Sequence, residues 1–113
     1  RSLNVEEYET RLRQRVGEAE YVRHKELVRL LARNLALEDV LWEEILVCIR
    51  DVNARTELLR QRNQIVRDIH TEFRALNIEV PTEMEKSAEG FGSFLEELVD
   101  DEKRETPEKP VDR

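Results

Sequence analysis

The stretch VLWEEILVCIRDV, residues 40–52, limits the possible folds more than any other segment of this sequence. Its apolar residues point in almost every direction around a helix, and only the Glu43–Glu44 pair, Arg50 and Asp51 interrupt them. A helix that is apolar nearly all round must be buried nearly all round. Charged residues make up 40% of the chain, so apolar surface that could cover this stretch is scarce elsewhere.

The composition indicates long helices. The 113-residue chain is rich in Glu, Arg, Leu and Val, contains 5% aromatic residues, and has three glycines and three prolines. This profile is typical of coiled coils and helical bundles, and the length allows one domain at most. We therefore expect an all-α fold: a long helical hairpin or coiled coil with a short C-terminal helix, completed by another chain.

Residues 1–77 are expected to form the helical hairpin or coiled coil. Asn4 and Glu7 are spaced as a capping box ahead of apolar residues at helical spacing, which predicts the start of a first helix. Asn34 can end that helix in a left-handed conformation, and the acidic residues Glu38 and Asp39 suit the start of a second helix. We favour an antiparallel hairpin that turns near Asn34 over the alternative, one continuous rod.

The expected second helix spans residues 37–76 and carries a heptad pattern. Apolar residues occupy five successive a positions, which indicates a coiled coil; they are Ile45, Val52, Leu59, Val66 and Phe73. The d positions are Leu41, Cys48, Arg55, Arg62, Ile69 and Leu76. The two arginines at d either pair with carboxylates of a partner chain, which would fix the register, or extend to water where the seam opens.

A two-helix hairpin would cover only one side of residues 40–52. Apolar surface that stays in water forgoes about 25 cal/mol per Å² of burial and invites association. We therefore expect a protein partner, either a second copy of the chain or a different helical subunit. The predicted interface combines the seam with the apolar residues beside it: Leu41, Trp42, Ile45, Leu46, Cys48, Ile49, Val52, Arg55, Leu59, Arg62, Val66, Ile69 and Phe73.

The character of the chain changes after Asn77, and the net charge of −7 comes from this acidic part. Residues 78–92 are expected to be a linker, residues 93–104 a short acidic amphipathic helix, and residues 105–113 a disordered tail. The short helix carries an apolar stripe: Phe91, Phe94, Leu95, Leu98 and Val99. This stripe either docks in a groove of a target protein or packs as a further helix on the chain's own core.

Catalysis and ligand binding have little support in the sequence. It contains no glycine-rich phosphate loop, no nucleophile elbow and no paired zinc motif. His24 and His70 have no other metal-ligand residue types at ligand spacing, so we expect two surface histidines. We therefore expect a chain that is not an enzyme and that has no catalytic residues, no cofactor and no metal site.

The remaining features bear on partners and location. Arginines alternate with acidic residues rather than forming a basic stripe, which disfavours nucleic-acid binding. No apolar run approaches the ~20 residues that a membrane span needs. Cys48 is the single cysteine, which excludes an internal disulfide and fits a reducing intracellular setting, cytoplasmic or nuclear. We expect Cys48 to act as a small core residue rather than as a cross-link between two copies.

The sequence thus favours a non-catalytic structural or oligomerisation subunit, or a segment of one, that mediates protein–protein assembly through a helical bundle or coiled coil. The alternative is a regulatory adaptor whose acidic Phe/Leu C-terminal helix docks on a target protein. No motif in the chain carries a diagnostic resemblance to a known family.

Overall fold

The computed structural model describes residues 4–80, Phe91 and residues 94–99. In this part of the chain the fold is all-α, as predicted, with α1 at Val5–Val16, α2 at Glu18–Arg23, α3 at Lys25–Val47 and α4 at Val52–Ala75. Residues 94–99 are also helical. The expected tail and most of the expected linker lie outside the described residues, as do Ser93 and residues 100–104 of the expected acidic helix.

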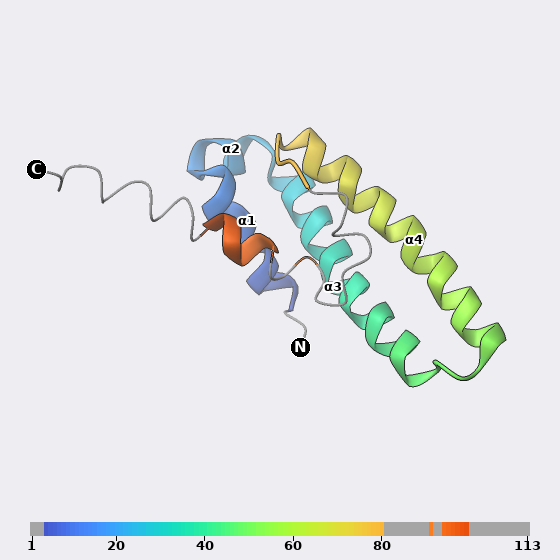
Figure 1. Cartoon of the computed structure of the whole chain (residues 1–113). Helices are drawn as coiled ribbons and strands as arrows, with labels where there is room; N and C mark the ends of the chain where they lie inside the picture. The colour runs from blue at the N-terminus through green and yellow to red at the C-terminus, as the bar shows by residue number, and fades with distance from the viewer. Residues whose placement is uncertain (1–3, 81–90, 92–93, 100–113) are drawn as a thin grey trace, which may run out of the picture.

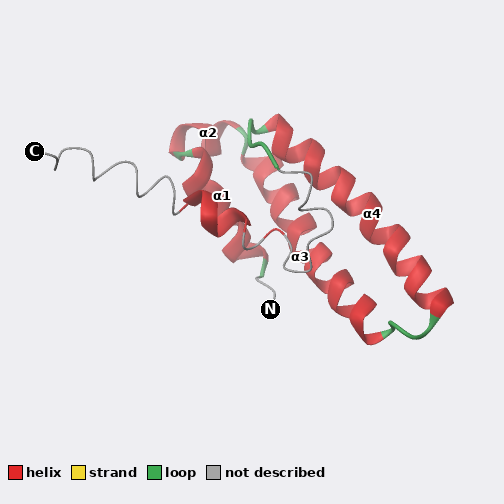
Figure 2. Cartoon of the chain, viewed as in Figure 1, coloured by secondary structure: helices red, strands yellow, loops and turns green. Residues whose placement is uncertain are grey.

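The helices α3 and α4 lie side by side as a long antiparallel hairpin (Figure 1). The helix α1 packs on α3, and the short α2 connects these two helices. Figure 2 shows α1, α2 and residues 94–99 against the half of the hairpin that is farther from its turn. The hairpin therefore extends beyond these covering elements at its closed end.

The ends of α1 are set by local sequence. The predicted capping box is confirmed: the Asn4 side chain accepts from the Glu7 backbone N–H at 2.8 Å, and the Glu7 carboxylate accepts from the Asn4 N–H at 3.0 Å. The helix stops at Gly17, whose φ of 92° and ψ of 160° belong to a region that L side chains rarely adopt. This glycine separates α1 from α2 and allows the chain to reverse direction, so that α1 lies against α3.

The hairpin turns at Cys48–Asp51, so both the predicted turn near Asn34 and the alternative of one continuous rod are wrong. Asn34 lies inside α3, where its side-chain amide donates to the two carboxylate oxygens of Glu72 on α4 at 3.1 and 3.0 Å. The actual turn is stabilised by Asp51, whose N–H donates to the Cys48 carbonyl at 3.0 Å and whose carboxylate accepts from the Ala54 N–H at 3.2 Å. Asp51 is therefore the N-cap of α4.

The turn also corrects the predicted second helix, because residues 37–76 belong to two different helices. Leu41 and Ile45 lie on α3, where they are buried. Within α4 the heptad positions Arg62, Val66, Ile69 and Phe73 are buried, whereas Val52 is exposed and Arg55 and Leu59 are partly buried. A continuous seam cannot cross a hairpin turn, since the chain direction reverses there.

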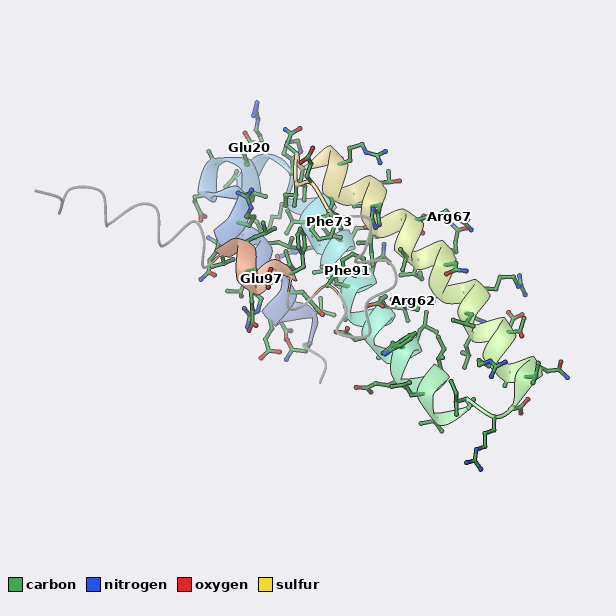
Figure 3. All side chains as sticks on the ribbon, viewed as in Figure 1. Glu20, Arg62, Arg67, Phe73, Phe91 and Glu97 are labelled. Carbon is green, nitrogen blue, oxygen red and sulfur yellow. The ribbon has the colours of Figure 1, made fainter. Side chains whose placement is uncertain are left out.

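One hydrophobic core joins α1, α3, α4 and the C-terminal stripe. Its fully buried side chains come from all four: Leu12, Val28, Leu31, Ala32, Leu35, Ile69, Phe73, Phe91 and Leu95. The Phe73 ring lies 6.0 Å from the Phe91 ring and 5.9 Å from the Phe94 ring between centroids, the latter in an edge-to-face arrangement. Figure 3 places Phe73 and Phe91 together in the middle of this half of the molecule.

The C-terminal stripe therefore packs on the chain's own core. Phe91, Phe94, Leu95 and Val99 are buried, and Leu98 is partly buried against the same core. An ion pair of 2.9 Å between Arg11 and Glu96 joins α1 to this segment at the surface. Of the two arrangements expected from the sequence, the structure has the further helix on the core, and the stripe is not exposed for docking on another protein.

Replacing Phe91 tests this assignment. We expect Phe91→Ala to lower the free energy of unfolding by about 3–5 kcal/mol, because a fully buried phenylalanine leaves a cavity when it is truncated. Urea denaturation followed by circular dichroism measures the loss. The control is Glu97→Ala on the same segment, since Glu97 is exposed and a surface substitution should change the free energy by less than about 0.5 kcal/mol. Equal effects of the two substitutions would exclude the stripe from the core.

Candidate protein interface

The residues predicted for the interface divide into two classes in the structure. Those that are buried within the chain are Leu41, Ile45, Arg62, Val66, Ile69 and Phe73. Those that reach the surface in part or in full are Trp42, Leu46, Cys48, Ile49, Val52, Arg55 and Leu59. The first class does not need another chain to cover it in this structure, because the chain's own helices and its C-terminal stripe bury these residues.

Arg62 forms a buried ion pair with Glu38 of α3. Its Nε donates to a Glu38 carboxylate oxygen at 2.7 Å, and the side chains of Arg62 and Glu38 are only 5% and 1% exposed. Burial raises the pKa of the Glu38 carboxyl, and the adjacent Arg62 guanidinium opposes that rise. Arg62 therefore neither needs a carboxylate from a partner chain nor extends to water, since a carboxylate of its own chain pairs with it.

The same guanidinium covers Trp42. The Arg62 Cζ atom lies 4.7 Å from the centroid of the Trp42 ring, a cation–π contact between the two helices of the hairpin. Trp42 is half-buried as a result. A partner chain was expected to cover Trp42, whereas α4 of the same chain provides part of this cover through Arg62.

Two more polar contacts tie α3 to its neighbours. The Tyr8 hydroxyl of α1 donates to the Asp39 carboxylate at 2.5 Å, and burial raises the pKa of that phenol. Asn34 and Glu72 connect α3 to α4, and burial raises the pKa of the Glu72 carboxyl while the hydrogen bond from Asn34 lowers it. Partly buried polar pairs of this kind define which residues lie opposite one another, because a shift of one helix would leave them unpaired.

The exposed apolar side chains gather toward the hairpin turn. We define the hairpin surface by the large apolar residues exposed between positions 37 and 52: Leu37, Val40, Leu46, Val47, Ile49 and Val52. Val47 is 84% exposed and Val52 is 58% exposed, although each lies at the end of a long helix. The covering elements lie against the other half of the hairpin (Figure 1), so in the described structure these residues face solvent.

Three of the six residues that define the hairpin surface were predicted from the sequence as interface residues. Leu46, Ile49 and Val52 were predicted interface residues, whereas Leu37, Val40 and Val47 were not. The signal for the missed residues is their spacing along α3, since they lie at helical intervals on a face away from the a and d positions of the predicted heptad.

Polar groups surround the hairpin surface. Glu43, Glu44 and Arg50 are exposed beside it. Arg55, the second arginine of the predicted seam, donates from Nη1 to the Ile49 carbonyl at 2.5 Å and so stabilises the turn itself. A protein interface typically has an apolar centre and a polar rim, and the exposed end of the hairpin has both.

The described residues offer no arrangement for metal binding, because no group of three or more His, Cys, Asp or Glu side chains in them could hold an ion. His24 lies 3.3 Å from Glu20 at the surface. His70 is half-buried with its ring edge-on to Phe91, so the prediction of a surface histidine is wrong there. The contact with Phe91 comes from a segment distant in sequence, which local patterns could not reveal. No helix in the described part of the chain is long and apolar enough to cross a membrane.

No protein-family model matches this chain, and no curated protein and no solved structure matches it either. Its function is therefore inferred from the surface and the contacts described above.

The buried ion pair can be tested by removing one partner and then both. We expect Arg62→Leu to destabilise the fold by about 3–5 kcal/mol, because it leaves the Glu38 carboxyl buried without its partner. The double substitution Glu38→Leu with Arg62→Leu should recover most of that loss. The control is Arg60→Leu, whose exposed pair with Glu57 should contribute less than about 1 kcal/mol. Urea denaturation measures all three, and a double variant as unstable as Arg62→Leu would contradict the pairing.

Glu72 predicts a pH dependence of stability. Its pKa in the folded chain is raised above the ordinary 4.5, so the stability from its protonation is complete below that value and is lost as the pH rises through the raised pKa. Glu72→Gln, which cannot ionise, should therefore be more stable than the wild type at pH 7, and the difference should vanish near pH 4. Thermal unfolding at both pH values measures this.

The control for Glu72 is a carboxyl shifted the other way. A hydrogen bond from Tyr21 lowers the pKa of Glu9, so that group stabilises the fold above its ordinary pKa and the stabilisation is lost as the pH falls. Glu9→Gln should therefore be less stable than the wild type at pH 7. A Glu72→Gln difference that does not change with pH would contradict the burial effect.

Proposed function

We propose that this chain is a non-catalytic assembly module that joins protein subunits through the hairpin surface. The observation that carries the proposal is the group of exposed apolar side chains toward the closed end of the hairpin, beyond the elements that cover its other half. A contiguous exposed apolar surface on a monomer is often functional, and Leu37, Val40 and Val47 are exposed at helical spacing on one face of α3.

The contacts beneath the hairpin surface support this function. The Glu38–Arg62 pair and the Trp42–Arg62 contact hold α3 and α4 together where the covering elements stop. The apolar side chains are therefore presented on a hairpin with a defined register. A surface that is already ordered loses less conformational entropy when a partner binds.

The regulatory adaptor is the less favoured function. It requires the C-terminal stripe to be free, and Phe91 and Leu95 are fully buried in the core. Docking on a target would first expose both side chains, which opposes binding by several kcal/mol. The hairpin surface needs no such rearrangement.

The kind of partner and the cellular setting that we propose are those predicted from the sequence. The partner is a second copy or a different helical protein rather than nucleic acid, because the arginines alternate with acidic residues instead of forming a basic stripe. The setting is intracellular, since the single cysteine fits a reducing compartment. No enzyme activity is part of the proposal.

Site-specific photo-crosslinking in cells that produce the protein tests this function. A photoreactive amino acid at Val47 or at Val52 should form a covalent adduct with a polypeptide of defined mass, because both positions lie on the hairpin surface. The same amino acid at Arg67 is the control, since Arg67 is exposed on the outer side of α4 (Figure 3). Adducts absent from both hairpin positions, or equally abundant at Arg67, would contradict the proposal.

A further inference from the structure

One exposed face of α3 has a pattern that fits a particular partner. We define the outer stripe as six exposed residues on this helix: Leu30, Arg33, Leu37, Val40, Glu44 and Val47. The residues that α3 buries against the rest of the chain lie on its other faces: Val28, Leu31, Ala32, Leu35, Glu38, Leu41 and Ile45. The outer stripe is therefore a second, separate face of the same helix.

The outer stripe has the spacing of a coiled-coil seam. Its residues follow one another at intervals that alternate between three and four positions, as a and d positions of a heptad do. At about 1.5 Å per residue, the stripe is roughly 25 Å long. Four of its positions are apolar, and the two charged positions have opposite signs.

The stripe is also symmetric about its own centre. Leu37 and Val40 lie equally far from the midpoint between residues 38 and 39, and so do the outer apolar positions Leu30 and Val47. The same holds for Arg33 and Glu44. When two copies of such a helix pack antiparallel about a two-fold axis at this midpoint, each residue meets its counterpart twice, as a two-fold interface requires.

Charge decides the direction of the pairing. In the antiparallel arrangement, Arg33 of each copy lies opposite Glu44 of the other copy, which forms two pairs of opposite charge. In a parallel arrangement, Arg33 would lie opposite Arg33 and Glu44 opposite Glu44, which is unfavourable. The leucine and valine positions pair with apolar residues in the antiparallel arrangement.

We propose that two copies of this chain associate through their outer stripes, with α3 packed antiparallel to α3 about a two-fold axis between Leu37 and Val40. This inference rests on the proposed assembly function and identifies its partner as a second copy. One helix on each side provides less than the ~800 Å² per partner of a standard interface, so the dimer is reversible and depends on concentration. Leu46 lies on another face of α3, so it stays available to a further subunit.

Charge reversal of the full chain, followed by sedimentation velocity over a concentration series, tests the geometry. Arg33→Glu alone and Glu44→Arg alone should each weaken dimerisation about tenfold or more, because each replaces two favourable pairs by two repulsive ones. The double variant, with both substitutions in one chain, should restore dimerisation. An equimolar mixture of the two single variants should form the dimer as well.

The control is Arg67→Glu, a charge reversal on the exposed side of α4 that should leave dimerisation unchanged. Circular dichroism verifies that each variant keeps the helical content of the wild type. A wild-type chain that stays monomeric over the whole series would overturn the proposal. So would a double variant that dimerises no better than the single variants, since parallel pairing places like charges opposite one another in all of them.

The outcome also separates this inference from the proposed function. A monomeric chain that still forms adducts from Val47 or Val52 with a different polypeptide would overturn self-association and leave the assembly function in place. A monomeric chain without such adducts would overturn both.

Discussion

The pairing of Arg62 with Glu38 is the constraint on which the hairpin depends. Two opposite charges buried at 2.7 Å between α3 and α4 fix the register of these helices, because a slip of one turn would leave both charges buried and unpaired. The pair also lies where the molecule changes character. On one side α1 and the C-terminal stripe cover the hairpin, and on the other side the apolar residues near the turn face solvent. Asn34 and Glu72 repeat this polar connection farther from the turn.

The features that could be predicted from the sequence are those set by short-range physics. The capping box at Asn4 and the apolar face of α4 depend on residues a few positions apart, and both were predicted. The position of the turn depends on a contact that local patterns do not contain. Asn34 resembles a helix end until Glu72, far along the chain, provides an acceptor for its amide. Asp51, which does cap α4, was taken for an interruption of an apolar stretch.

The candidate interface shows the same division. The rule that a helix apolar on all sides must be buried on all sides identified residues 40–52, and Leu41 and Ile45 are indeed buried. What covers them is the chain's own α4, with Arg62 over Trp42, and this depends on a turn that the pattern alone did not locate. The outer stripe was not recognised because its residues lie on both sides of the expected break. Once α3 is known to be continuous, their spacing is plain.

The core has one more consequence, for the order in which the protein can fold during its synthesis. Phe91 and Leu95 complete the core to which α1 contributes. The ion pair between Arg11 and Glu96 joins α1 to the same C-terminal segment at the surface. The ribosome makes α1, α3 and α4 well before it makes this last part of the core. Until residue 99 has left the exit tunnel, the nascent chain therefore exposes the part of the core that Phe91 and Leu95 cover, and exposed apolar surface of this kind favours aggregation and capture by chaperones.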